Sequence, residues 1–368
     1  MTVYDFVIVG AGMAGASLAA ELASHGSVLL LEAEDTPGYH ATGRSAAFWD
    51  ECYGGPDVVP LTLASGPWLR EHGFLRQRGA LYIGREQDAG ALDSFAREFE
   101  QIGARLELVE RDALKQRVPG LRDAWKGGVW EPGCADIDVA ELHQHYLRSA
   151  AQAGAELRCR ARVGKAERTD ELWRIAVGLD EVRAGILINA AGAWADDVAA
   201  NAGVAPLGLL PLSRTVVQLR TDPAPPPDMP LVLDINGGFY FKPEAGRLWL
   251  SPHDERPSAA TDAAPDELSV AEAIARFEEI VDWRIAAVER RWAGLRTFAP
   301  DRRPVYGFDR QADGFFWFAG QGGFGIQTAP AAARLAAQIL LGQGGDAMTR
   351  TLDPDLYRPR SSQSEHAC

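Results

Sequence analysis

Three glycines and an acid near the start of the chain have the types and spacing needed to hold a dinucleotide. Gly10, Gly12 and Gly15 form the pattern Gly-x-Gly-x-x-Gly, and Glu32 follows the next apolar run. The first glycine permits a tight turn, the second lets the backbone approach a pyrophosphate, and the third lets a helix pack close to a sheet. A carboxylate at the position of Glu32 accepts hydrogen bonds from a ribose diol and disfavours a 2′-phosphate there. These residues therefore predict dinucleotide binding.

A strand, a turn, a helix and a second strand must position these residues. The apolar runs at 4–9 and 28–31 predict two buried strands, and the stretch between them predicts a helix. The start of that helix would offer free N–H groups and positive dipole character to phosphates. Because the glycines stand in this complete context, an ordinary glycine-rich turn is the less favoured interpretation.

Two distant segments predict further parts of the same domain. Residues 186–194 form an apolar run that ends in small residues, and residues 315–331 form an apolar run, a glycine-rich turn and the start of a helix. Small residues at the carboxyl end of a strand let a cofactor pass closely. The nucleotide-binding domain is therefore predicted to be assembled from separate parts of the chain.

These patterns predict an α/β protein with two interleaved domains. A Rossmann-type domain would comprise residues 1–50, 132–204 and 305–368. The intervening residues, 51–131 and 205–304, contain strand-like runs. They are predicted to form a mixed-sheet α+β domain that covers the cofactor and binds the substrate.

Composition and charge exclude several classes of function. Hydrophobic residues make up 46% of the 368 residues, and 37 Lys and Arg against 51 Asp and Glu give a net charge of −14. This acidity argues against a nucleic-acid partner and against docking on an anionic membrane. No apolar run approaches the roughly 20 residues of a transmembrane helix, and the start of the chain lacks a signal-peptide pattern. The four cysteines, Cys52, Cys134, Cys159 and Cys368, lack disulfide or metal spacing, so a cytoplasmic protein without a metal is expected.

Several longer strings resemble one family of flavoproteins. They lie at residues 37–47, 135–138, 189–192, 292–296 and 321–328. In order, they resemble the FAD-dependent D-amino acid oxidase superfamily, which includes glycine and sarcosine oxidases, and most closely its bacterial D-arginine dehydrogenases. The resemblance covers nearly the whole chain and implies FAD rather than NAD as the cofactor.

The resemblance also implies which residues contact FAD. The early glycines would hold the pyrophosphate, Glu32 the ribose and Val163 the adenine, and the helix start near 322–328 would stabilise the reduced, anionic flavin. Sarcosine-oxidase-like proteins attach the flavin to a cysteine after the position of Arg296, and residues 297–304 contain none, so non-covalent FAD is expected. The implied cofactor-binding set is Gly10, Gly12, Met13, Ala14, Gly15, Glu32, Ala33, Thr42, Gly43, Arg44, Ser45, Ala46, Val163, Ala191, Gly192, Trp194, Gly322, Gly323, Phe324, Gly325, Ile326, Gln327 and Thr328.

Four further residues match the substrate site of the D-arginine dehydrogenases. Arg214 and Arg296 match the pair that clamps the substrate carboxylate, and Tyr53 and Tyr240 match two phenols that bind it. The planar fork of arginine suits a carboxylate, and amino-acid oxidation by flavin depends chiefly on positioning. The resemblance therefore implies an α-amino acid as the small-molecule substrate.

Departures from the family pattern bear on the substrate side chain. Ala80 stands where the D-arginine enzymes have a guanidinium-binding glutamate, and Phe48 and Asp50 replace a histidine and a threonine. We therefore expect deamination of D-amino acids by hydride transfer from Cα–H to flavin N5, giving an imino acid, with neutral or hydrophobic side chains preferred over D-arginine. An inward-facing Asp50 or Glu51 would instead restore a cation site, and Ala80→Glu is expected to raise activity on D-arginine.

Other interpretations stay open on the sequence. Oxidation of N-substituted glycines such as sarcosine or iminodiacetate would use the same clamp, and a non-catalytic flavoprotein would bind FAD for structure or electron relay. An NAD-dependent dehydrogenase is disfavoured because the segments around Gly192 and Gly322 would then have no role. The sequence predicts neither the electron acceptor, oxygen or a quinone or other carrier, nor the oligomeric state.

Overall fold

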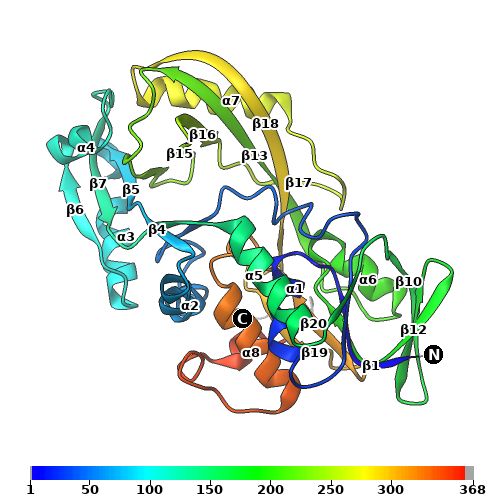
Figure 1. The fold of residues 1–368 in the computed structure, drawn as a ribbon. Helices are drawn as coiled ribbons and strands as arrows, with labels where there is room; N and C mark the ends of the chain where they lie inside the picture. The colour runs from blue at the N-terminus through cyan, green and yellow to red at the C-terminus, as the bar shows by residue number, and fades with distance from the viewer. Residues whose placement is uncertain (1, 361–368) are drawn as a thin grey trace, which may run out of the picture.

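An eight-stranded sheet unites three distant stretches of the chain in the computed structural model, which describes residues 2–360 (Figure 1). Its core is parallel, with β1 between β2 and β12 and with β20 beside β12. Apolar runs form these strands because parallel strands are buried on both faces. In sheet order the strands are β10 (Val163–Thr169), β11 (Leu172–Val177), β12 (Asp180–Asn189), β1 (Val3–Val9), β2 (Val28–Leu31) and β9 (Glu156–Arg158), with β20 (Phe315–Ala319) and β19 (Val305–Phe308) continuing from β12.

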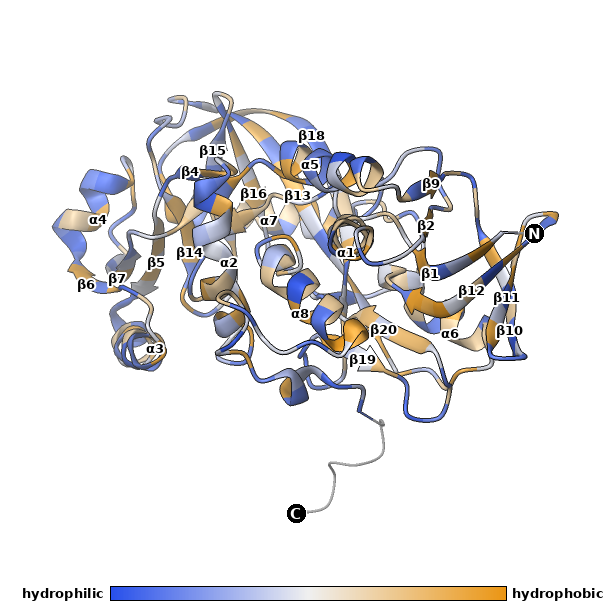
Figure 2. Ribbon diagram, turned by 60° about the horizontal axis from the view of Figure 1, so that its bottom comes forward, coloured by the Kyte–Doolittle hydropathy of each residue, from blue (hydrophilic) through white to orange (hydrophobic). Residues whose placement is uncertain are grey.

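The two faces of this sheet are covered differently. Alternate residues of the central strands, such as Ile8 and Phe316, pack against α1 (Met13–Leu22) and α8 (Ala329–Leu341). Their neighbours, such as Val7 and Phe315, pack against α6 (Ala195–Asn201) and the β10–β11 hairpin. Helix α5 (Val139–Gln152) lies beside α1, and α2 (Val59–Glu71) packs on α8. In Figure 2, β20 is hydrophobic along its length, as expected for a strand enclosed on both sides.

A nine-stranded mixed sheet forms the second large sheet of the fold. Its longest strands, β13 and β18, are antiparallel along their whole length and arch over the molecule in Figure 1. Helix α7 (Glu267–Ile280) packs its apolar residues on this sheet, and α3 (Ala89–Gln101) and α4 (Arg111–Arg117) flank the far end. In sheet order the strands are β17 (Arg256–Pro257), β13 (Leu210–Asp222), β16 (Arg247–Ser251), β15 (Tyr240–Glu244), β14 (Leu231–Asp234), β5 (Ala80–Arg85), β7 (Trp125–Glu131) and β6 (Glu107–Glu110), with β18 (Arg284–Phe298) also paired to β13.

A small three-stranded sheet lies between the eight-stranded and the nine-stranded sheets. Strand β8 (Ala135–Ile137) pairs with both β3 (Phe48–Trp49) and β4 (Leu75–Gln77). Asp136 of β8 accepts a hydrogen bond from Lys242 Nζ of β15 at 2.8 Å and lies 2.6 Å from Arg78 Nη2. These cations lower the pKa of Asp136 to about 2, against the opposing effect of burial. The buried ion pairs therefore tie the small sheet to the nine-stranded one.

The predicted fold class, a Rossmann-type α/β domain with an interleaved mixed-sheet domain, is confirmed. The exact domain ranges stay a prediction: α2 belongs by sequence to the range 51–131, yet it packs on α8. Residues 361–368, which include Cys368, lie outside the described residues. Among the described helices, none has the length and apolarity needed to cross a bilayer.

Candidate active site

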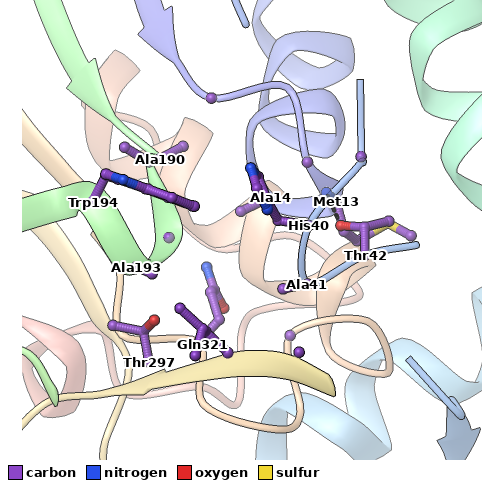
Figure 3. Close-up of a pocket in the computed structure, with 18 of the residues that line it drawn as sticks. Met13, Ala14, His40, Ala41, Thr42, Ala190, Ala193, Trp194, Thr297 and Gln321 are labelled. Carbon is purple, nitrogen blue, oxygen red and sulfur yellow. Dashed lines mark hydrogen bonds between the residues drawn. The ribbon is translucent and has the colours of Figure 1, made fainter. Parts of the chain in front are cut away.

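A cavity of about 460 Å³ lies where the strands of the eight-stranded sheet end. Val9, Leu31, Ala190 and Ala319, at the carboxyl ends of β1, β2, β12 and β20, line its floor. Figure 3 shows side chains from several separate segments facing this space, among them Met13, His40, Trp194 and Gln321. Ligands of open α/β sheets bind at this edge, and the volume falls in the range of ligand pockets.

The first turn has the geometry of an anion cradle. Gly10 has φ +100°, and a Cβ there would lie 2.6 Å from the carbonyl oxygen of Ala190. Gly12 precedes α1 and has no side chain that could cap the helix. The Met13 N–H donates to Thr42 Oγ1 at 2.9 Å. The remaining N–H groups at the start of α1 are therefore available for a phosphate.

Glu32 lies at the end of β2 and lines the same cavity. It is 9% exposed, and its two oxygens accept hydrogen bonds from the backbone N–H groups of Ala11 and Glu34, each at 3.0 Å. A carboxylate retains further lone pairs, so Glu32 can also accept from ribose hydroxyls. The cradle and this carboxylate together fit a dinucleotide such as FAD.

Most residues of the predicted cofactor set line the cavity. They are Gly10, Gly12, Met13, Ala14, Glu32, Ala33, Thr42, Arg44, Ser45, Ala46, Val163, Ala191, Gly192, Trp194, Gly322, Gly323, Gly325 and Ile326. The described lining residues include no cysteine.

Five residues of that set do not line the cavity but support it. Gly15 and Gly43 lie against the backbone oxygens of Gly10 and Gly38, where a side chain would collide. The buried side chains of Phe324, Gln327 and Thr328 pack beneath the glycine-rich turn, and Thr328 Oγ1 donates to the Phe324 carbonyl at 2.9 Å.

Arg44 lines the cavity, but its guanidinium is engaged elsewhere. It donates to the carbonyl oxygens of Ala263 at 2.8 Å and Ala293 at 3.2 Å, and it forms an ion pair with Asp262. These contacts hold the loop before α7 against the residues around Arg44, and a role of Arg44 in binding the cofactor stays a prediction.

Two arginines, one buried and one partly buried, face the cavity from adjacent strands. Arg214 of β13 pairs with Gly294 of β18, and Arg296 pairs with Leu212, so the two arginines are diagonal neighbours on one face of the sheet. Both line the cavity. Long side chains at diagonal positions come within reach of the same ligand.

Arg214 has a donor without a partner. Its Nε donates to the Asp254 carbonyl at 2.7 Å and its Nη2 lies 3.3 Å from Glu255 Oε1. The buried Nη1 has no hydrogen-bond partner among the described residues. Burial, followed by the charge of Arg296, lowers the pKa of Arg214 to about 10. The guanidinium is therefore still charged near neutral pH, and besides its ion pair with Glu255 it keeps Nη1 available for a second anion.

Tyr53 and Tyr240 surround Arg296. The Arg296 Nη1 donates to the Tyr53 hydroxyl at 2.6 Å, and Tyr240 lines the cavity beside it. Although burial disfavours the charge, the phenols of Tyr53 and Tyr240 raise the pKa of Arg296. The structure thus brings together all four residues predicted to bind a substrate carboxylate.

The three residues predicted to line a side-chain pocket do not line the cavity. Asp50 and Ala80 are 0% exposed, and Phe48, 8% exposed, packs against Tyr53 and Tyr240 with ring centroids 5.5 and 5.9 Å apart. Asp50 accepts a hydrogen bond from Tyr82 instead of facing a ligand. A glutamate at position 80 would enter a closed core, so the expectation that Ala80→Glu raises activity on D-arginine loses its basis.

His253 is a neighbour of the clamp that the sequence did not indicate. It adopts φ +57°, its Nδ1 lies 2.9 Å from the Gly237 carbonyl oxygen, and its ring contacts Tyr240 edge-on at 5.7 Å. Burial, followed by the charges of Arg214 and Arg296, lowers the pKa of His253 to about 3. Residues held at positive φ cluster at functional sites, which is consistent with the place of His253 beside the two arginines.

Several other cavity residues were also missed. His40 lies in the string 37–47 and contacts the Trp194 ring at 4.6 Å, so its place near the cofactor could have been inferred. Tyr39 and Gln321 also lie within strings of the resemblance, 37–47 and 321–328. Others come from regular elements or from loops that carry no pattern of their own: Asp197 and Asn201 of α6, Thr297 of β18, and the loop residues Arg162, Thr261 and Ala263.

Comparisons with known proteins agree with this geometry. The family model described as FAD dependent oxidoreductase matches residues 5–339. The chain is 26% identical to glycine oxidase from Geobacillus kaustophilus over 92% of this chain and 93% of that protein. The chain is also 24% identical to human mitochondrial dimethylglycine dehydrogenase. This match covers 96% of the present chain and 44% of the human protein.

Solved structures share the fold. The crystal structure of glycine oxidase from Geobacillus kaustophilus superposes with a TM-score of 0.84 at 23% identity, covering 98% of this chain and 99% of that one. Iminodiacetate oxidase from a Chelativorans species superposes with a TM-score of 0.78 at 23% identity, covering 96% and 98%. These similarities do not show a particular closeness to D-arginine dehydrogenases, which stays a prediction.

Proposed function

Because the chain belongs to the family of FAD dependent oxidoreductases, we propose that it oxidises the carbon–nitrogen bond of glycine or N-substituted glycines such as sarcosine. FAD is the cofactor, and when bound it supplies the two-electron acceptor. The observation that carries the proposal is the unpaired, buried Nη1 of Arg214 beside the partly buried guanidinium of Arg296. A substrate carboxylate would complete this site.

The two arginines and two phenols position the substrate. A carboxylate between Arg214 and Arg296 receives charge-assisted hydrogen bonds, which are stronger than neutral ones and fix orientation. Tyr53 keeps Arg296 in place, and Tyr240 can donate its hydroxyl to the same carboxylate. Holding the carboxylate fixes where the α-carbon lies, which is the main contribution a protein makes to this reaction.

The size of the substrate is limited by the aromatic cluster of Phe48, Tyr53 and Tyr240. Phe48 fills the space behind the two phenols, and the positions beyond it, Asp50 and Ala80, are enclosed. This packing favours an α-carbon with little or no side chain. The relatives named glycine oxidase, dimethylglycine dehydrogenase and iminodiacetate oxidase support the same choice.

Deamination of D-amino acids with hydrophobic side chains is the second candidate. The apolar character of Phe48 favours it, because that ring offers no partner to a charged side chain. A non-catalytic flavoprotein is the weaker alternative, since it would leave the buried donor of Arg214 without a function.

A steady-state substrate panel tests the proposal. Sarcosine, glycine, N,N-dimethylglycine, iminodiacetate, D-alanine, D-leucine and D-arginine are compared with an artificial dye and with oxygen as acceptors. The proposal expects the highest kcat/KM among the glycine derivatives. A kcat/KM for D-leucine above that of every glycine derivative would overturn it in favour of the second candidate.

A further inference from the structure

Two carboxyl groups, Asp50 and Glu131, are enclosed next to the aromatic cluster and outside the cavity. Both residues are 0% exposed, and a carboxyl oxygen of Asp50 lies within 4.8 Å of one of Glu131. Asp50 follows strand β3, and Glu131 ends β7 directly opposite Ala80 of β5. Neither carboxyl has a part in the proposed binding of substrate or FAD, and buried acids of this kind are rare without a partner.

Three of the four carboxyl oxygens accept a hydrogen bond from a neighbouring group. Asp50 Oδ2 accepts from the Tyr82 hydroxyl at 2.7 Å, and Oδ1 accepts from the Cys52 N–H at 2.8 Å. Glu131 Oε1 accepts from the Glu51 N–H at 2.7 Å. The fourth oxygen, Glu131 Oε2, is buried and has no hydrogen-bond donor in the part of the chain that the structure describes.

Within residues 2–360, neither carboxyl group forms a salt bridge with a cation. Among the described residues, the groups that shift the pKa values of the pair are each other, Tyr82, Glu51 and backbone N–H groups, and Cys52 and Cys134 lie close by. Burial, followed by the neighbouring Asp50, raises the pKa of Glu131 well above its usual range. Two like charges enclosed together cannot both be maintained.

We propose that Asp50 and Glu131 share one proton, carried on Glu131 Oε2 and donated to Asp50, and that this acid pair holds residues 50–53 in position. The proton gives the fourth oxygen its hydrogen bond and leaves one negative charge, which Tyr82 and the Cys52 N–H stabilise. The proton is assigned to Glu131 because the two carboxyl groups accept different numbers of hydrogen bonds. Besides the proton, Asp50 accepts two hydrogen bonds, whereas Glu131 accepts one.

The acid pair acts on the substrate site through the backbone. The Asp50 N–H donates to Gln327 Oε1 at 3.2 Å, and Gln327 Nε2 donates to the Tyr53 carbonyl at 3.2 Å. The hydroxyl of Tyr53 then accepts from Arg296. Asp50 and Glu131 are therefore positioning residues for Tyr53, a role that rests on the proposed function, whereas the shared proton does not.

Three matched variants test the shared proton through stability. Glu131→Gln replaces the protonated acid by an amide that can donate to Asp50 and accept from Glu51, so its Tm should stay within about 2 °C of wild type. Asp50→Asn places an amide N–H₂ where the carboxylate accepts hydrogen bonds from its neighbours, so the Tm should fall by about 5 °C or more. Glu51→Gln, a half-buried neighbour, serves as the control. Equal losses for Glu131→Gln and Asp50→Asn would contradict the proposed asymmetry.

Protons and vibrational bands give a readout that packing alone would not change. Unfolding of the wild type near pH 7 should release about one more proton than unfolding of Glu131→Gln, because unfolded glutamate is ionised there. Infrared spectra should contain the C=O band of a protonated carboxyl group, lost in Glu131→Gln and kept in Glu51→Gln. Absence of both signals, or stoichiometric bound zinc in their place, would overturn the proposal.

The same samples separate this inference from the proposed function. If the proton signals are present but no glycine derivative is oxidised, the acid pair stands and the substrate is wrong. If glycine derivatives are oxidised without the proton signals, the acid pair is wrong and the proposed function is unaffected. Asp50→Ala should raise the KM for sarcosine more than it lowers kcat, because it loosens Tyr53 and not the cofactor; an unchanged KM would contradict the positioning role.

Discussion

The Nη1 of Arg296 donates a hydrogen bond to the hydroxyl of Tyr53 at 2.6 Å, joining residues that are 243 positions apart. This contact links β18 of the nine-stranded sheet to the segment that follows β3 of the small sheet. It occupies one donor of Arg296 and leaves the other donors of its guanidinium for a ligand. With the unpaired Nη1 of Arg214, the arrangement is complementary to a carboxylate.

Arg214→Lys tests the guanidinium fork at constant charge. Lysine cannot make the planar bidentate contact, so kcat/KM for the best substrate should fall about 100-fold or more. The measurement is a steady-state comparison with wild type, with Arg291→Lys on the exposed part of β18 as the control. A loss of less than threefold at Arg214 would remove this residue from the clamp.

Phe48→Ala tests the limit on substrate size. Removing the ring opens space behind Tyr53 and Tyr240, so kcat/KM for D-leucine relative to sarcosine should rise by about tenfold, the scale of a few methylene contacts. The variant should also lose about 3–5 kcal/mol of stability. Phe308→Ala, which removes a ring that is 38% exposed, is the control and should leave the ratio unchanged.

The sequence predicted the parts of the site that depend on local pattern. The glycines around Gly10, the acid Glu32 and the turn around Gly322 follow apolar runs whose character identifies them as strands, and all three line the cavity. The family resemblance also pointed to Arg214 and Arg296, and the antiparallel register of β13 and β18 brings them together.

The rest of the site depends on contacts between distant parts of the chain. Residue type alone does not show that Arg44 turns to Asp262, a residue 218 positions away, or that Asp50 turns to Tyr82. Ala80 was expected to face the substrate, but a matching position in a strand does not indicate which face of the strand borders the cavity. His253 lacked any signal, since its character comes from burial beside two arginines.

His253 predicts a specific dependence of stability on pH. Unfolded histidine titrates near pH 6.5, whereas the pKa of His253 is lowered to about 3. Between these values the unfolded chain binds a proton that the folded chain does not, so stability falls as the pH drops from about 6.5 toward 3, by up to about 1.4 kcal/mol per pH unit. His253→Gln should flatten this slope in urea unfolding, whereas exposed His25→Gln should not; equal slopes in all three proteins would contradict the neutral state of His253.

Glu32→Gln tests the ribose contact of the cofactor site. The amide keeps the shape but loses the charge, so the FAD dissociation constant should rise about 10- to 100-fold, as expected for hydrogen bonds to a charged group. Fluorescence titration of the apoprotein with FAD gives this constant. Asp35→Asn, an exposed acid that pairs with Arg160, is the control, and an unchanged FAD affinity for Glu32→Gln would exclude the ribose contact.

The carboxylate clamp is tested most directly by the flavin absorbance of the wild-type protein under anaerobic conditions, with sarcosine and with its amide. The two compounds differ only in the group that Arg214 and Arg296 should bind. The account predicts that sarcosine bleaches the flavin band and that the amide does so at least about 100-fold more slowly. Equal bleaching by both compounds, or a flavin that dithionite reduces and no amino carboxylate does, would contradict it.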